Sequence, residues 1–193
     1  MNASTRMLLP LVIAMLLAPL TACALSGKAI EGKVLEEGTN KPIPDAIVIA
    51  RWSGHLATFA HGKTVCYHVL STTTDENGAY RFPAWKKKIT EDWQKNVRPE
   101  TVIITVHKPG YAEYRPPGYV RTEAFKQNVR YLKPFTGPRE ERLKYLLHFS
   151  GLVGCYGAGD EKSLVPVYKA LYDEARGIAT SDKDKDIDRK SVV

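Results

Sequence analysis

Short stretches of alternating hydrophobic and polar residues fill much of the first two thirds of the chain, a pattern typical of half-buried β-strands. One such stretch runs from Ile30 to Glu36. Another places Tyr80 and Phe82 on one face of a strand, directly after the turn residues Asn77-Gly78. Because Asn-Gly readily adopts the positive φ angles of a two-residue turn, the region from 72 to 82 predicts a β-hairpin.

Further strands are expected on either side of this hairpin. The predicted strands cover residues 46–52, 65–74, 101–107, 111–114 and 128–132. Segments 53–64 and 83–99 interrupt the alternation, so we expect them to be insertions: a loop, and a long loop or short helix. Short strands separated by turn residues predict a mainly β fold, specifically a β-sandwich over residues 29–135.

The hydrophobic period changes after Pro138, a residue suited to the first turn of a helix. Glu140 and Glu141 would then lie at the positive end of the helix dipole. The predicted apolar positions are Leu143, Leu146 and Leu147 in a first helix, and Leu164, Tyr168, Leu171, Ala175 and Ile178 in a second. We expect a helical hairpin over residues 136–179, packed on the sandwich, and a disordered tail over 180–193.

The first 22 residues have the features of a secretory signal peptide. Arg6 is the only charged residue before an apolar run from Met7 to Leu20, which is short for a membrane span. The run ends in Leu20-Thr21-Ala22-Cys23, which resembles the lipobox of bacterial lipoproteins. The resemblance implies a mature chain that begins at an acylated Cys23, with membrane lipid as its partner.

Residues 23–28 then form a short lipidated linker. Ala24, rather than Asp, follows the cysteine, which in a Gram-negative cell indicates the periplasmic face of the outer membrane. An ordinary signal peptide, cleaved at the small residues around Ala22, remains the alternative.

Two further cysteines, Cys66 and Cys155, remain after Cys23. An even pair in an exported protein predicts a disulfide, because the cell envelope outside the cytoplasm is oxidising. This disulfide would tie the β region to the helical region. The alternative is a pair of buried thiols too far apart to bridge.

Several of these segments together resemble the carboxypeptidase regulatory-like domain. The matching segments are Ile30–Val34, Thr39 with Pro42-Ile43, Asp45–Val48, Thr74–Phe82 and Lys108–Tyr111. The resemblance covers roughly residues 28–115 and implies a transthyretin-like Greek-key β-sandwich of about seven strands. In that family the domain accompanies an enzyme and is not its catalytic part, so the resemblance implies a structural or binding module.

Composition agrees with an ordinary globular protein: 44% of the residues are hydrophobic and 25% are charged. The net charge of +7 favours an anionic surface, such as lipid headgroups, as a partner. In an exported protein we expect an envelope protein or a glycan as a further partner, and no nucleic acid.

Common catalytic motifs are missing from the sequence. No histidine begins a His-x-x-Glu or His-Glu-x-x-His metal motif, and Gly-x-Ser-x-Gly is absent. Hydroxyisourate hydrolases share the transthyretin fold and end in Tyr-Arg-Gly-Ser, whereas this chain ends in Lys190-Ser191-Val192-Val193. We therefore expect a non-enzymatic protein without a cofactor. The alternative is a small hydrolase or metal-dependent enzyme that uses the loop from His55 to His68.

Two weaker candidate sites remain. His55, His61, Cys66 and His68 lie within fourteen residues, and Cys66 and His68 would project from the same face of a strand, as Zn or Cu ligands can. The alternative is a set of surface histidines with a partly buried His68.

The second candidate consists of Trp85, Lys86, Lys87, Lys88 and Trp93. Aromatic side chains beside lysines could stack on sugars, including peptidoglycan, or lie at a lipid interface. The alternative is that the tryptophans cover the edge of the core and the lysines keep that edge soluble.

Overall fold

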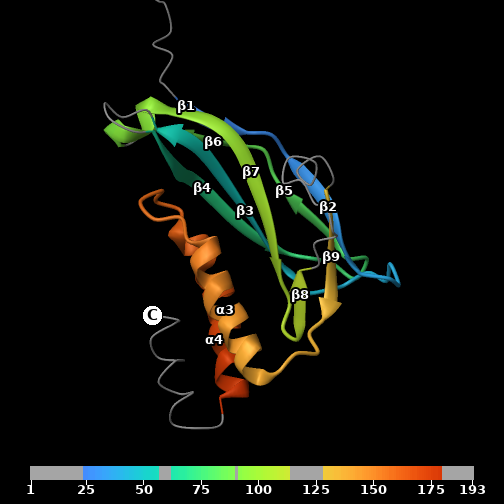
Figure 1. The fold of residues 1–193 in the computed structure, drawn as a ribbon. Helices are drawn as coiled ribbons and strands as arrows, with labels where there is room; N and C mark the ends of the chain where they lie inside the picture. The colour runs from blue at the N-terminus through green and yellow to red at the C-terminus, as the bar shows by residue number, and fades with distance from the viewer. Residues whose placement is uncertain (1–23, 57–61, 90, 114–127, 180–193) are drawn as a thin grey trace, which may run out of the picture.

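A computed structural model describes residues 24–56, 62–89, 91–113 and 128–179, and the fold is mainly β with two helices on the C-terminal side (Figure 1). At this level the predicted fold class is confirmed. The proposed signal peptide, Cys23 and the predicted disordered tail lie outside the described residues.

Three sheets make up the β part of the described chain. The strands are β1 (Ala24–Gly27), β2 (Ile30–Glu36), β3 (Ile47–Leu56), β4 (Lys63–Thr73), β5 (Ala79–Phe82), β6 (Trp85–Lys88), β7 (Val97–His107), β8 (Tyr111–Glu113) and β9 (Val129–Pro134). One sheet has the order β5-β2-β9-β8, the second β4-β3-β7, and the third pairs β1 with β6. Within them only β2 and β9 run parallel.

The main hydrophobic core lies between the four-stranded and three-stranded sheets. Its fully buried residues include Val34, Phe82 and Leu132 from the first sheet and Val48, Ala50 and Val106 from the second. The positions alternate along each strand, as the hydrophobic pattern predicts. Each fully buried aliphatic or aromatic side chain contributes roughly 1.5 to 3 kcal/mol to folding.

The outer face of the three-stranded sheet is covered by the helical layer (Figure 1). The layer comprises α3 (Arg139–Val153), the 3-10 helix η2 (Glu161–Leu164) and α4 (Val165–Ile178). Ile49 of β3 and Val69 of β4 are fully buried there against Leu146, Phe149 and Leu171. The apolar positions predicted for the second helix are all buried or half-buried. Of those predicted for the first helix, Leu147 is 47% exposed.

The predicted hairpin is wrong in its pairing, although the chain does turn at the predicted place. Gly78 has a φ of +66°, and Asp75 Oδ1 accepts hydrogen bonds from the backbone N–H groups of Asn77 and Ala79. However, β4 pairs with β3, whereas β5 pairs with β2 in the other sheet. Buried Thr74 anchors the crossing by donating to the carbonyl of Ile43. The turn therefore joins the two layers of the sandwich.

Two segments that the sequence assigned to a linker and an insertion form a sheet together. Residues 24–27, expected in the linker, are strand β1, and residues 85–88, expected in the insertion, are strand β6. The rest of that insertion contains the 3-10 helix η1 (Asp92–Asn96) and the start of β7. Pairing between strands so distant in sequence leaves no local signal, so periodicity could not find it.

Candidate functional site

The lysines of β6 point in two directions. Trp85 and Lys87 are half-buried, whereas Lys86 and Lys88 are exposed, as alternation in a strand requires. Lys87 Nζ donates a hydrogen bond to Asp160 Oδ2 at 2.6 Å and another to a backbone carbonyl of the same loop. The middle lysine therefore binds the segment between α3 and η2.

Asp160 also binds a buried histidine from β4. His68 Nδ1 lies 2.7 Å from Asp160 Oδ2, and the His68 side chain is 8% exposed. Burial lowers the pKa of His68, and the hydrogen bond to Asp160 opposes only part of that effect. The imidazole is then neutral at neutral pH, and we assign its Nδ1–H as the donor to Asp160.

Aromatic rings surround this histidine. The ring centroid of His68 lies 3.8 Å from that of Trp85 and 5.0 Å from that of Trp52. His68 Nε2 is buried and has no hydrogen-bond partner among the described residues. A general base must reach the proton of its substrate, and His68 Nε2 is enclosed by protein. The carboxylate of Asp160, which pairs with His68, is neutralised by Lys87. The arrangement therefore suits a structural tie better than acid–base catalysis.

Cys66 and Cys155 form a disulfide, which confirms the predicted pairing. Their Cα atoms are 5.3 Å apart, across a sequence separation of 89 residues. The bond joins β4 to the chain just after α3, in the same segment that carries Asp160. The sandwich and the helical layer are therefore linked covalently.

A β-bulge at Tyr67 overturns the expectation that Cys66 and His68 share a face. His68 pairs with Trp52 of β3, but Cys66 pairs with Ser53, the next residue, so Tyr67 is the extra residue in β4. Because successive residues of a strand point to opposite faces, Cys66 lies on the helix side of the sheet and His68 on the other.

The disulfide removes one of the candidate metal ligands, because Cys66 in a disulfide has no thiolate to bind a metal. His55 lies near the end of β3, opposite Thr64 and Arg98. His61 lies outside the described residues. Across the part of the chain that the structure describes, no group of three or more potential ligands is placed to hold a metal ion.

The two tryptophans of the candidate glycan site are half-buried against the main core. Trp85 contacts Trp52 edge to face, with centroids 5.3 Å apart, and lies against His68 as described above. Trp93 belongs to η1 and packs against the same core. Trp85 therefore has one face covered by protein, which leaves less of its ring for a sugar.

A second buried polar cluster was not predicted from the sequence. Arg142 of α3 donates from Nε and Nη2 to Glu174 Oε1 of α4, at 2.8 and 2.6 Å, and from Nη1 to the carbonyl of Tyr111. The side chains of Arg142 and Glu174 are 5% and 9% exposed. The only sequence signal was a pair of charged residues on otherwise apolar helix faces, and such residues are common on surfaces.

His107 at the end of β7 completes this cluster. Its Nε2 lies 3.4 Å from Glu174 Oε2, and the side chain is fully buried. Burial, and then the positive charge of Arg142, lower the pKa of His107 to about 4. The ring is therefore neutral at neutral pH, while Glu174 is balanced by Arg142.

One concave surface lies between α3 and the neighbouring strands β7, β8 and β9. Its volume is about 410 Å³, and it is lined by Thr105, Glu113, Lys133, Tyr145, His148, Phe149 and Leu152. Burial raises the pKa of Tyr145, whose hydroxyl accepts a hydrogen bond from the backbone N–H of Glu113. The size of this concave surface falls in the range of small-molecule sites, although it is an open hollow and not an enclosed cavity.

In the described segments we find no helix with both the length and the hydropathy needed to cross a membrane.

Comparison with known proteins yields little. No protein-family model matches the chain, and a search of curated proteins finds no match. Among solved structures, the chain is similar to a 9R-lipoxygenase from Cyanothece PCC8801, with 11% sequence identity and a TM-score of 0.28. The aligned region covers 84% of this chain and 28% of the lipoxygenase. Likeness at this level gives no information on function.

Proposed function

We propose that this chain is an exported bacterial lipoprotein, anchored through acylated Cys23, whose folded part is a non-catalytic structural or binding module of the cell envelope. The observation that carries the proposal is the disulfide between Cys66 and Cys155. Disulfides persist in oxidising compartments and are rare in the cytosol. The lipobox-like sequence before Cys23 independently indicates export.

The compartment that fits best is the periplasmic face of the outer membrane. Ala24 follows the acylated cysteine, and three acyl chains would anchor the domain durably, since each buried CH2 contributes about 0.8 kcal/mol. Membrane lipid is then the first partner. A glycan or an envelope protein is the second.

We further propose that the sandwich is transthyretin-like and related to carboxypeptidase regulatory-like domains. Two facing sheets with a mainly aliphatic core support this assignment. The segment Thr74–Phe82, which carries the family's turn motif, joins one sheet to the other. A module of this kind would present a fixed surface to its partner and perform no chemistry.

The cavity beside α3 is the best candidate for the binding part of this function. It lies between the helical layer and the sheet, so a ligand would contact both layers. Binding of glycans through Trp85 and Trp93 is the alternative, and it is weakened by the packing of Trp85 on His68. Titration of peptidoglycan fragments against the protein and against Trp93→Ala and His148→Ala variants separates the two sites.

Replacing the proposed lipidation residue tests the anchoring directly. In the native host, the wild-type chain should fractionate with the outer membrane, and a Cys23→Ser variant should be lost from the membrane fraction. A Cys23→Ser variant that remained in the membrane fraction as fully as the wild type would refute the lipid anchor. Quantitative blotting of sucrose-gradient fractions provides the measurement.

A further inference from the structure

The exposed side of β6 lies beside the proposed lipid anchor. Strand β1 begins at Ala24, the residue after Cys23, and its register places Ala24 opposite Lys88 and Ser26 opposite Lys86. Consecutive Cα atoms are about 3.8 Å apart, and opposed Cα atoms in an antiparallel pair are about 4.5 to 5.5 Å apart. Backbone geometry alone therefore holds Lys88 within about 10 Å of the anchor residue.

Strand β1 gives the anchor no flexible spacer. Leu25 is 7% exposed and belongs to the main core. Gly27 lies so close to β6 that a Cβ on it would come within 2.7 Å of Trp85 Cε2 and 3.0 Å of Trp52 Nε1. Because the first four residues after the anchor are fixed to the domain in this way, the acyl chains would fix which side of the domain faces the membrane.

The side of the domain that would face the membrane is basic at its centre. Alternation turns Lys86 and Lys88 outward, while Lys87 is held by Asp160 on the inner side. The strands of the larger sheets bring Lys63 and Arg98 to the same end of the molecule, because Leu56 at the end of β3 pairs with Lys63 and the adjacent His55 pairs with Arg98.

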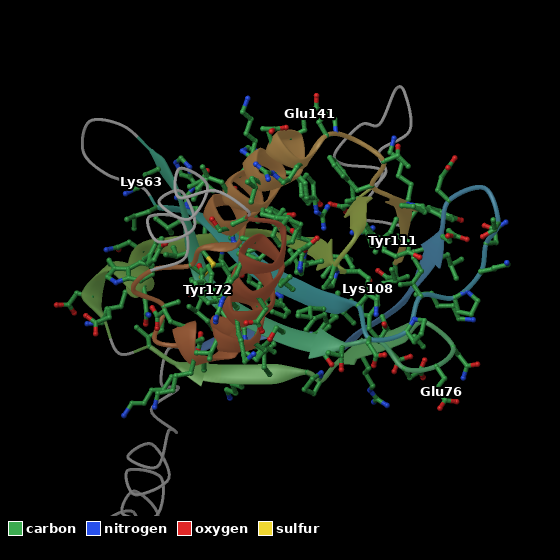
Figure 2. The ribbon with its side chains drawn as sticks, turned by 90° about the horizontal axis from the view of Figure 1, so that it is seen from below. Lys63, Glu76, Lys108, Tyr111, Glu141 and Tyr172 are labelled. Atoms are coloured by element: carbon green, nitrogen blue, oxygen red, sulfur yellow. A yellow bond between two sulfur atoms is a disulfide. The ribbon has the colours of Figure 1, made fainter. Side chains whose placement is uncertain are left out.

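Acidic residues near this end lie outside β6. They include Glu91 before η1, Asp92 in η1 and Glu100 in β7, and Asp92 is paired with Lys95 at 2.6 Å. Asp160, which binds Lys87, and exposed Glu161 at the start of η2 lie on the helix side of the strand. Figure 2 shows Lys63 and Glu76 at opposite ends of the molecule, so the turn after β4 would lie away from the end that carries Lys63.

We propose that the exposed face of β6, centred on Lys86 and Lys88, is a docking surface for the anionic phospholipid headgroups of the membrane that holds the acyl chains of Cys23. The docking surface depends on the proposed lipidation and adds an orientation to it. Lysines are attracted to an anionic leaflet over about one Debye length, roughly 8 to 10 Å. The strand register keeps Lys88 within about that distance of the anchor residue. The Glu76 turn then points away from the membrane.

Lysine footprinting on vesicles tests this orientation with the natural protein. The acylated mature chain is reconstituted into phosphatidylcholine vesicles and into vesicles of phosphatidylcholine mixed with phosphatidylglycerol, and is then modified with a membrane-impermeant amine reagent. Mass spectrometry measures the modification rate of each lysine. We expect Lys86 and Lys88 to react at least about three-fold more slowly on the anionic vesicles, and high salt to remove the difference. Exposed Lys41 and Lys144 serve as internal controls and should react equally on both.

A paired substitution checks that charge causes the protection. Replacing the two surface lysines (Lys86→Gln with Lys88→Gln) should raise the reaction rate of Lys63 on anionic vesicles. The control replacement (Lys41→Gln with Lys144→Gln), which removes the same charge elsewhere, should leave that rate unchanged. All four lysines are exposed, so neither variant disturbs the core.

The outcomes separate the two proposals. Equal rates for Lys86 and Lys88 on both kinds of vesicle, with the protein still floating with the vesicles, would overturn the docking surface and leave the anchor intact. A protein that fails to float with either kind of vesicle would overturn the anchor, and the docking surface with it.

Discussion

Lys87 and Asp160 are 73 residues apart in the chain, yet Lys87 Nζ lies 2.6 Å from Asp160 Oδ2. The same carboxylate oxygen binds His68 Nδ1, and Cys155 of the disulfide belongs to the same segment between α3 and η2 as Asp160. At the other end of α3, Arg142 binds Glu174 and the backbone of β8. The helical layer is therefore tied to the sandwich at both ends.

The Lys87–Asp160 contact should stabilise the fold measurably, because a partly buried hydrogen bond to a charged group contributes about 1.5 to 3 kcal/mol. We expect Lys87→Met to lower the free energy of unfolding by about 1 to 2 kcal/mol after allowance for partial exposure. The matched control is Lys86→Met on the exposed side of the same strand, which should change stability by less than about 0.5 kcal/mol. Urea unfolding followed by circular dichroism gives both values. Equal effects of the two substitutions would show that the contact contributes nothing.

Loss of Glu174 should be more damaging, because it leaves the Arg142 guanidinium buried without a counter-charge. Breaking a buried ion pair by removing one partner costs about 3 to 5 kcal/mol, so Glu174→Gln should lower the unfolding free energy by several kcal/mol.

The neighbouring Asp173→Asn provides the control, since Asp173 pairs with Lys169 on the helix surface. Exposed pairs of this spacing contribute about 0.3 to 0.5 kcal/mol. Thermal unfolding should rank the two variants clearly, and a Glu174→Gln protein as stable as Asp173→Asn would contradict the buried cluster.

Acid should destabilise the protein through His107. Its pKa in the folded state is about 4, below the ordinary value of 6.5, so the unfolded chain binds a proton more readily between these two values. Stability is full above pH 6.5 and falls as the pH drops toward about 4, by about 3 kcal/mol at most.

A His107→Gln variant should lose part of this pH dependence. The pKa of His68 is lowered as well, so a smaller acid effect in the same direction should remain. Urea midpoints measured at intervals between pH 7.5 and pH 4 compare the slopes. A variant with the same slope as the wild type would mean that His107 is solvated in solution.

Removal of the disulfide should loosen the joint between the layers. Closing a loop of 89 residues constrains the unfolded chain by about 4 to 5 kcal/mol in the entropic model. We expect a Cys66→Ala, Cys155→Ala double variant, or the reduced wild type, to melt at a lower temperature. If reduction leaves the melting temperature unchanged, the disulfide is not part of what holds the fold together.

Features set by nearby residues could be predicted from the sequence. The turn at Asn77-Gly78 and the two helices depend on short-range preferences and periodicity, and the structure contains them. The disulfide followed from the count of cysteines and the expected compartment. These inferences need no knowledge of which strand lies beside which.

Features set by the meeting of distant segments could not be predicted. The pairing of β1 with β6 depends on the whole course of the chain between them. The bulge at Tyr67 places Cys66 and His68 on opposite faces of β4. Nothing in the residue types of this strand indicates a bulge. The burial of Arg142 and Glu174 follows from the packing of α3 on α4, and a helix sequence alone would place both residues on the surface.

The exported, anchored module is tested most directly by the intact mass of the mature protein from its native host, recorded before and after reduction. The account predicts a chain that begins at Cys23, carries the mass of its acyl groups, and gains two hydrogens on reduction. A chain that keeps its first 22 residues, or lacks acyl groups and has both Cys66 and Cys155 reduced from the start, would contradict it.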